Sequence, residues 1–303
     1  MSKRYKKGRD INGVVLLDKA SGGSSNAVLQ QVKRLFGANK AGHTGSLDPL
    51  ATGLLPICLG QATKVAQFLL DDDKRYLVHA KFGQVSSTGD SEGKVVNFGS
   101  TKGINESSIR TILSQFIGDI NQVPPMYSAL KRNGTPLYKL ARKGIEIERS
   151  PRPVTIHEIN FLDLEEAVVS LEVFCSKGTY IRTLVEDIGK SLGCGGHVVE
   201  LRRTGFAHLD LSGSKTYEQL SKLKEQNIES LDSVILSADE MLPNLKSVYL
   251  DSEQTRDIRL GKKIEYLGFS ASHKLKLYDH NKQFLGIGES NPMSEILPKR
   301  LFV

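Results

Sequence analysis

The sequence contains little cysteine. Its three cysteines, Cys58, Cys175 and Cys194, lie far apart in a chain of 303 residues and form no C-x-x-C pair. An odd number at such spacing argues against a disulfide framework and against a zinc ribbon. The seven histidines form no H-E-x-x-H pattern, which is the spacing of a helical zinc site. We therefore expect no metal centre.

Long apolar runs and cofactor motifs are also missing. The longest apolar runs, such as residues 14–17, are far shorter than the ~20 residues that span a bilayer. The basic N-terminus is not followed by the apolar core of a secretory signal. Neither G-x-x-x-x-G-K-[ST] nor G-x-G-x-x-G occurs, so no nucleotide cofactor is expected. These absences predict a cytoplasmic protein without a membrane segment or a small-molecule cofactor.

Positive charge, in contrast, is in excess. The chain has 41 Lys and Arg against 34 Asp and Glu, which gives a net charge of +7. Such a balance suits a polyanionic partner. Basic pairs recur at positions 33–34, 142–143 and 202–203, although each pair alone is also compatible with a solvated face. Few acidic residues surround Arg202 and Arg203, and this modestly favours RNA as the partner.

Hydrophobic periodicity predicts alternating helices and strands. A buried strand is expected at 11–19, then a helix that Ser24 to Asn26 cap and Gly37 ends. A helix of about ten residues carries Ala62, Val65, Ala66, Leu69 and Leu70 on one face. Strands are expected at 76–82, 126–131 and 168–175, a mobile loop or hairpin at 85–99, and helices at 105–117 and from about 181.

The run from Gly42 to Pro56 is the most unusual stretch. Three glycines and two prolines exclude a helix interior or a central strand. Asp48 is its only acidic residue, and Pro49 favours an extended or turn conformation for it. A single carboxylate on a stiff loop suits catalysis, but an Asx turn that satisfies nearby backbone N–H groups explains the same pattern.

This run, continued to Lys64, resembles the aspartate loop of the TruB family of pseudouridine synthases, which act on uridine 55 of tRNA. Four further stretches resemble that family in the same order: Asp73–Tyr76, Pro124–Lys131, Lys177–Leu184 and Leu201–Thr204. The resemblance covers roughly residues 10 to 210 well. Ordered matches of this length are far more specific than a short glycine-rich pattern.

The resemblance implies an α+β fold with a mixed, mostly antiparallel central sheet, flanking helices and a small C-terminal β module. It assigns residues 1–245 to a pseudouridine synthase catalytic domain. Residues 246–303, where short strand-like runs begin, resemble by position a PUA-type RNA-binding domain. A purely structural β appendage is the alternative. The implied partner is the T stem-loop of tRNA.

The resemblance also implies roles for individual residues. Asp48 is the expected nucleophile or charge stabiliser, and Arg182 its ion-pair partner. Arg182 lies in the first turn of a helix, off the apolar stripe, where a cation opposes the helix dipole and needs a nearby anion. Tyr76 is expected to stack on the target base and to act in proton transfer. The remaining expected RNA-contacting residues are His43, Tyr180, Leu201, Lys64, Lys131 and Arg202.

Two other functions fit parts of the sequence. A tRNA-binding folding factor would unfold and refold the tRNA elbow without depending on catalysis. Such a binder would not need the set of Asp48, Tyr76 and Arg182. A basic α/β protein of unrelated function would require five ordered matches to be accidental.

Overall fold

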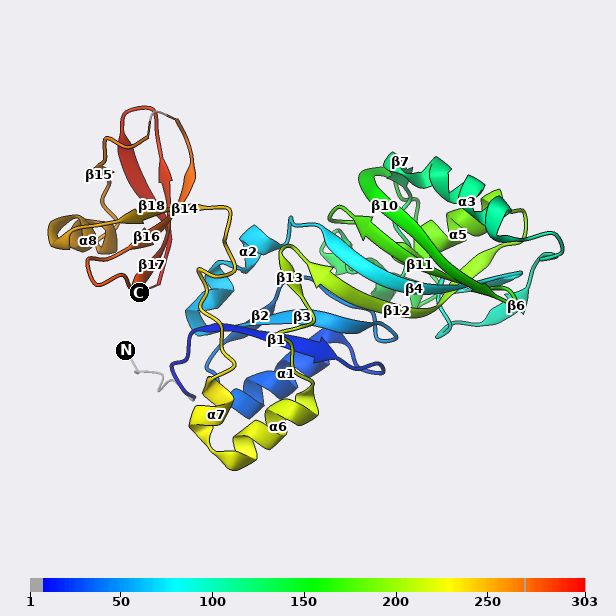
Figure 1. Ribbon diagram of the computed structural model, residues 1–303, viewed down its shortest axis with the longest axis horizontal. Helices are drawn as coiled ribbons and strands as arrows, with labels where there is room; N and C mark the ends of the chain where they lie inside the picture. Colours follow the sequence, from blue (N-terminus) through cyan, green and yellow to red (C-terminus); the bar gives the residue numbers. More distant parts are fainter. Residues whose placement is uncertain (1–7, 270, 303) are drawn as a thin grey trace.

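The computed structural model describes residues 8–269 and 271–302 and contains a large and a small sheet (Figure 1). The nine-stranded sheet has the order β1-β3-β12-β4-β11-β10-β7, with β2 beside β3 and β13 beside β12. All its pairs are antiparallel except β3 with β12. Its strands are β1 (Gly13–Lys19), β2 (Ala41–His43), β3 (Thr52–Leu59), β4 (Lys74–Phe82), β7 (Gly118–Gln122), β10 (Arg152–Glu165), β11 (Val168–Cys175), β12 (Gly196–Phe206) and β13 (Leu209–Asp210).

Helices flank this sheet in two groups (Figure 1). One group lies beside β1, β2 and β3, and consists of α1 (Ser25–Phe36), α6 (Tyr217–Gln226) and α7 (Ile228–Asp232). The other lies beside β7, β10 and β11, and consists of α3 (Glu106–Leu113) and α5 (Ile181–Ser191). The predicted α+β class and the mostly antiparallel sheet are therefore confirmed.

Several elements begin and end where the sequence predicts. Ser24 accepts a hydrogen bond from the backbone N–H of Ala27 at the start of α1, and Gly37 ends that helix with φ 64°. A left-handed residue at this position satisfies the last helical carbonyls, and glycine adopts it without strain. In α5, Ile181, Leu184, Val185 and Ile188 are buried at helical spacing. The buried faces of α1 and α5 pack on the sheet and fix the positions of these two helices.

The expected strand at 126–131 is wrong. Only β8 (Lys131–Arg132) forms there, as a small hairpin with β9 (Thr135–Pro136). Pro124 and Pro125 remove two backbone donors, and the Ser128 N–H turns back to the carbonyl of Met126. This segment is therefore a turn, and it leaves the carbonyl of Tyr127 free for a side-chain donor.

The expected helix at 62–70 is broken in two. Residues Gly60–Lys64 form the 3₁₀-helix η1, and only Ala66–Leu69 form α2. Ala62 and Val65 are both buried, and their spacing of three places them on one face of a helix with three residues per turn. The helix at 105–117 likewise ends at Leu113, followed by the 3₁₀-helix η2 (Ser114–Phe116).

The segment predicted as a mobile loop or hairpin at 85–99 contains the hairpin of β5 (Gln84–Ser86) and β6 (Val95–Asn97). Asp90, in its connection, is 3% exposed. A buried carboxylate needs a partner, and this one faces Arg182. The middle of the connection, Gly89 and Asp90, is thus buried, while Ser87, Ser91 and Glu92 are exposed.

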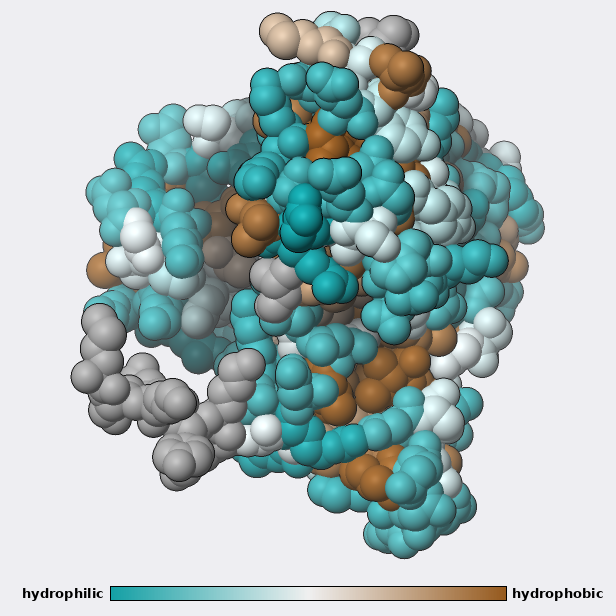
Figure 2. Space-filling model, turned by 90° about the vertical axis from the view of Figure 1, so that its left-hand side faces the viewer, coloured by the Kyte–Doolittle hydropathy of each residue, from teal (hydrophilic) through white to brown (hydrophobic). Residues whose placement is uncertain are grey.

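The small sheet, with the order β14-β16-β17-β18-β15, forms the C-terminal module. Its elements are β14 (Lys246–Tyr249), α8 (Ser252–Arg259), β15 (Ile264–Glu265), β16 (Lys274–Tyr278), β17 (Phe284–Ser290) and β18 (Glu295–Leu301). Ile287 is fully buried in one apolar cluster with Leu54 and Leu69, so the module shares a core with the large sheet. The face that carries this module is mostly hydrophilic, with hydrophobic residues in separate patches (Figure 2).

None of the helices in the described residues is long and apolar enough to cross a membrane. The helix α4 (Leu137–Ala141), which follows the β8–β9 hairpin, has only five residues.

Candidate active site

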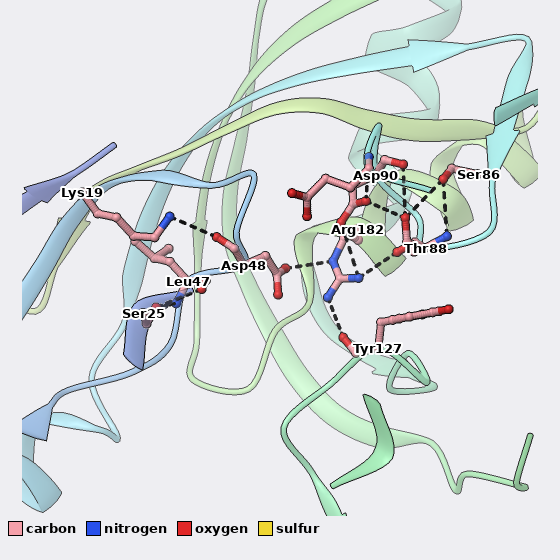
Figure 3. Close-up of polar contacts among 10 residues, drawn as sticks. Lys19, Ser25, Leu47, Asp48, Ser86, Thr88, Asp90, Tyr127 and Arg182 are labelled. Atoms are coloured by element: carbon pink, nitrogen blue, oxygen red, sulfur yellow. Dashed lines mark hydrogen bonds and ion pairs between the residues drawn. The ribbon is translucent and has the colours of Figure 1, made fainter. Parts of the chain in front are cut away.

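Asp48 lies in the turn that joins β2 to β3, and the backbone on both sides of it is held by side chains (Figure 3). On one side, the Ser25 hydroxyl accepts from the Leu47 N–H at 2.7 Å and lies 2.9 Å from the Leu47 carbonyl oxygen. On the other side, the Lys19 ammonium donates to the carbonyls of Ala51 at 2.7 Å and Asp48 at 3.3 Å. These contacts fix the backbone from which the carboxylate projects.

The ammonium of Lys19 is itself buried, with 1% of the residue exposed. Burial lowers its pKa to about 8, and the carboxylates of Glu92 and Asp48 partly oppose this shift. Four backbone carbonyls, those of Ala20, Asp48, Pro49 and Ala51, lie within hydrogen-bond distance of Nζ. Lys19 therefore stabilises the turn through neutral acceptors.

Arg182 is the main partner of the Asp48 carboxylate. Its Nε lies 2.9 Å from Asp48 Oδ2. Its Nη1 donates to the Thr88 carbonyl at 2.7 Å, and its Nη2 donates to the Tyr127 carbonyl at 2.8 Å (Figure 3). Asp90 Oδ2 lies 3.7 Å from Nη1. The guanidinium is thus held by two carbonyls and two carboxylates, and it presents Nε–H to the Asp48 turn.

The Asx turn that was the alternative for Asp48 does not form, because its carboxylate accepts no backbone N–H bond among the described residues. Arg182, its partner, is buried, with a side chain that is 4% exposed. Burial raises the pKa of Asp48, the charge of Arg182 lowers it, and the charge of Asp90 raises it. The ion pair therefore works against desolvation to keep the carboxylate ionised.

Tyr76 lies on β4 and is 8% exposed. Its register partners are Val173 on β11 and Arg203 on β12. Burial raises the pKa of its hydroxyl, and the charge of Arg203 opposes that shift. The charge of Asp48 also raises the pKa of this hydroxyl.

Three other predicted residues gather around this region. Tyr180 directly precedes α5, and its pKa is raised by burial and by Asp48, among other groups. Leu201, 7% exposed, precedes Arg203 by two positions on β12. His43 ends β2 with Nδ1 buried and without a hydrogen-bond partner in the described part of the chain, and burial and the charge of Arg203 lower its pKa.

Three predicted residues have contacts elsewhere. Arg202 forms a two-pronged pair with Asp18, at 2.7 and 3.0 Å, and so connects β12 to β1. Lys64 donates to the carbonyl of Leu301 in the C-terminal module at 2.6 Å. Lys131 is exposed on β8. Of the basic pair at 202–203, Arg203 is enclosed by the protein, whereas the Arg202 side chain is still 36% exposed beside Asp18.

Sequence reasoning missed Lys19, Ser25, Asp90 and Arg203. Lys19 has a weak signal, because it is a charged residue that ends an apolar strand. Asp90 lies in a stretch rich in Ser, Thr and Gly, a composition that predicts a loop and gives no sign of burial. Arg203 lies in the matched stretch Leu201–Thr204, but nothing in the sequence distinguishes it from its equally charged neighbour Arg202.

Comparison with known families agrees with this geometry. The description "TruB family pseudouridylate synthase (N terminal domain)" matches residues 33–181. The C-terminal domain of tRNA pseudouridylate synthase B matches residues 182–243, and the C-terminal region of pseudouridine synthase II TruB matches residues 247–302.

Curated relatives cover nearly the whole chain. The tRNA pseudouridine synthase B of Actinobacillus pleuropneumoniae serotype 5b is 51% identical over 305 residues, 99% of each chain. That of Haemophilus influenzae strain KW20 is 50% identical over 291 residues, 95% of this chain and 92% of its own.

Among solved structures, a Cbf5-Nop10-Gar1 complex contains a similar chain, with a TM-score of 0.70, 26% identity, and coverage of 93% of this chain and 79% of that one. A chain in an H/ACA RNP bound to a substrate RNA has a TM-score of 0.73 at 21% identity, and the match covers 100% of this chain and 92% of that one. At this identity the match supports the fold alone.

Fold, site and relatives together define an enzyme of the pseudouridine synthase class. Within that class, the chain belongs to the TruB family.

Proposed function

We propose that this enzyme isomerises uridine to pseudouridine in the T-arm loop of tRNA, at position 55. The observation that carries the proposal is the Asp48 carboxylate, fixed 2.9 Å from the buried guanidinium of Arg182 and still 38% exposed. Relatives at about half identity are named tRNA pseudouridine synthase B, which supports tRNA as the substrate.

The reaction breaks the N1–C1′ bond, rotates the uracil and joins C5 to C1′. No electrons are gained or lost overall. Asp48 can attack C1′, attack C6 of the ring, or stabilise positive charge while a glycal forms. Each role requires an ionised carboxylate with a fixed direction, and the bond from Arg182 Nε supplies both conditions.

The target base must leave its stack before it reaches Asp48. Extruding a loop nucleotide costs less than extruding one from a duplex. In this proposal, the ring of Tyr76 stacks on the extruded uracil, Leu201 and Tyr180 form the pocket wall, and His43 occupies the space that the base vacates. Stacking on an aromatic ring contributes roughly 1–3 kcal/mol per base and tolerates any sequence.

We assign catalysis to residues 1–245 and RNA binding outside the target loop to residues 246–303. The alternative for the second segment is structural support, which its shared core with the large sheet also permits. The proposed substrate implies action in the cytoplasm. Lys64 and Lys131 remain candidates for phosphate contacts, with Lys64 the weaker because Leu301 already accepts from it.

The test is single-turnover release of tritium from 5-³H-uridine in a tRNA T-arm stem-loop. The label leaves C5 only when the new carbon–carbon bond forms there. Wild-type protein should release it, and Asp48→Asn should release none while it binds the RNA within about tenfold of wild type, because phosphate contacts dominate affinity.

Residual release by Asp48→Asn at a tenth of the wild-type rate would remove Asp48 from its proposed role. Tight binding without release by the wild type would favour a tRNA-folding factor instead. Release by the Asp48→Asn variant would concern only the role of Asp48, whereas the absence of release by the wild type would concern the isomerase function itself. One experiment therefore separates the isomerase from the binder.

A further inference from the structure

Gln122, the last residue of β7, bonds both backbone groups of Tyr180. Its Oε1 accepts from the Tyr180 N–H at 3.0 Å, and its Nε2 donates to the Tyr180 carbonyl at 3.3 Å. The two residues are 58 positions apart in the chain, and Gln122 is 2% exposed. One buried side-chain amide thus makes the pair of hydrogen bonds that a residue of a neighbouring strand would make.

These two bonds lie where α5 begins. Tyr180 occupies the N-cap position of this helix and makes no side-chain capping bond within the described residues. Its carbonyl also accepts from the Leu184 N–H, which is the first bond of the helical ladder. The end of a helix leaves backbone groups without helical partners, and such groups need partners when they are buried. Gln122 therefore fixes the residue from which the helix starts, two positions before Arg182.

The chain that follows Gln122 returns to the same guanidinium. Five positions further on, the carbonyl of Tyr127 accepts from Arg182 Nη2 at 2.8 Å (Figure 3). Prolines at positions 124–125 restrict the backbone between these two points. The segment from Gln122 to Tyr127 and the start of α5 therefore form a closed ring that includes the Arg182 side chain.

The other member of the ion pair is held in the same way. The Ser25 hydroxyl, on a residue that is 3% exposed, bonds both the N–H and the carbonyl of Leu47, which directly precedes Asp48. Asp48 and Arg182 therefore each project from a backbone that one buried polar side chain fixes. Burying such a side chain costs free energy unless its polar groups are bonded. At Gln122, the bonds that meet this cost are the two to Tyr180.

We propose that Gln122 is a positioning residue for the isomerisation, which sets the direction of Arg182, and so of the Asp48 carboxylate, by holding the start of α5. The inference rests on the proposed function and gives Gln122 no contact with RNA. Its amide is neutral and buried, so it acts through geometry and not through charge. A displacement of about 1 Å in a catalytic site can lower a rate about 10²-fold. The expected effect is therefore on turnover and not on affinity.

The test is the pH dependence of single-turnover tritium release by Gln122→Met. Methionine has a similar length and makes neither bond. The rate constant near pH 7 should fall roughly 10- to 100-fold. The dissociation constant of the stem-loop should stay within about threefold of wild type, because phosphate contacts dominate affinity. The acid limb should move to higher pH, because the charge of Arg182 lowers the pKa of Asp48 and a displaced guanidinium lowers it less.

Gln219→Met is the matched control. Gln219 Oε1 accepts from the Thr216 N–H at 2.9 Å, at the start of α6. The change therefore removes a glutamine that caps another helix, and the pH–rate profile should stay that of the wild type. A wild-type rate for Gln122→Met, an unmoved acid limb, or a loss confined to RNA affinity would limit Gln122 to supporting the fold.

Gln122→Glu keeps the proposal testable if Gln122→Met does not fold. Its carboxylate still accepts from the Tyr180 N–H but repels the Tyr180 carbonyl, whereas the protonated carboxyl donates to that carbonyl as the amide does. Burial favours the protonated form. The ratio of the variant rate to the wild-type rate should therefore rise as the pH falls, and a low ratio that is the same at every pH would overturn the proposal. Tritium release by the wild type decides the isomerase function separately.

Discussion

Arg182 Nε lies 2.9 Å from Asp48 Oδ2, yet the arginine is buried while the carboxylate is partly exposed. Their side chains are 4% and 38% exposed. The carbonyls of Thr88 and Tyr127 fix the guanidinium from behind. The cation therefore acts as part of the scaffold, and the carboxylate stays accessible to a substrate.

Arg182→Lys should abolish most of the activity although it retains the charge. A lysine has no planar fork, so it cannot bond Asp48 and both carbonyls together. We expect turnover to fall by about 10²-fold, as when a fixed catalytic donor is removed. The free energy of unfolding should fall by about 2–4 kcal/mol because two carbonyls lose charged donors. Tritium release and urea denaturation measure these effects; near-wild-type turnover would show that charge alone suffices.

Asp90→Asn should move the acid limb of the pH–rate profile to lower pH. The charge of Asp90 raises the pKa of Asp48, so its removal lowers that pKa and Asp48 ionises at lower pH. The amide oxygen can still accept from Thr88 and from the Glu92 N–H. The plateau rate should therefore stay within about tenfold of wild type. A limb that moves to higher pH would contradict the assignment of Asp48 as the ionising group.

Lys19→Met should reveal a pH-dependent difference in stability. The pKa of Lys19 is about 8 in the folded protein, below its ordinary value of 10.5, so the unfolded chain binds more protons between these values. The stability of the wild type relative to the variant should therefore rise with pH, by about 2 kcal/mol between pH 7 and pH 10. Urea denaturation of both proteins at each pH tests this. A constant difference would show that the ammonium keeps an ordinary pKa.

Tyr76→Phe should keep RNA affinity within about twofold, because the aromatic ring still stacks. If Tyr76 acts in proton transfer, tritium release should slow, since its hydroxyl is gone. Binding and single-turnover rates on the same stem-loop separate the two effects. Unchanged kinetics would limit Tyr76 to stacking.

Lys64→Met decides between two uses of one ammonium. The bond to Leu301 predicts unchanged RNA affinity and a loss of about 1 kcal/mol in the free energy of unfolding. A phosphate contact predicts weaker binding to every RNA and a salt slope reduced by about 1. Titrations at several salt concentrations distinguish the two.

The sequence predicted best where local chemistry and family resemblance agreed. Asp48 was marked by Pro49 and by the absence of other acids, and Arg182 by its position off the apolar stripe of α5. The pairing of Asp48 with Arg182 was implied by resemblance, since no local pattern connects residues so far apart. The strand expected at 126–131 failed because its carbonyls bond a side chain and a turn in place of a neighbouring strand.

The buried polar residues could not be predicted for a related reason. Lys19, Asp90 and Arg203 are ordinary surface residue types, and each is buried by segments distant in sequence. Their burial depends on tertiary contacts such as Arg203 with Leu54, which periodicity does not encode. Arg202 and Arg203 look identical in sequence, yet one is paired with Asp18 and the other is enclosed.

The position of β12 in the sheet has a consequence for synthesis of the protein. β12 lies between β3, next to the Asp48 turn, and β4, which carries Tyr76. Both strands leave the ribosome long before β12 does. A nascent chain that stops before Gly196 has the Asp48 turn and the Tyr76 strand with no strand between them. Interrupted translation should therefore yield fragments in which the proposed site is not assembled.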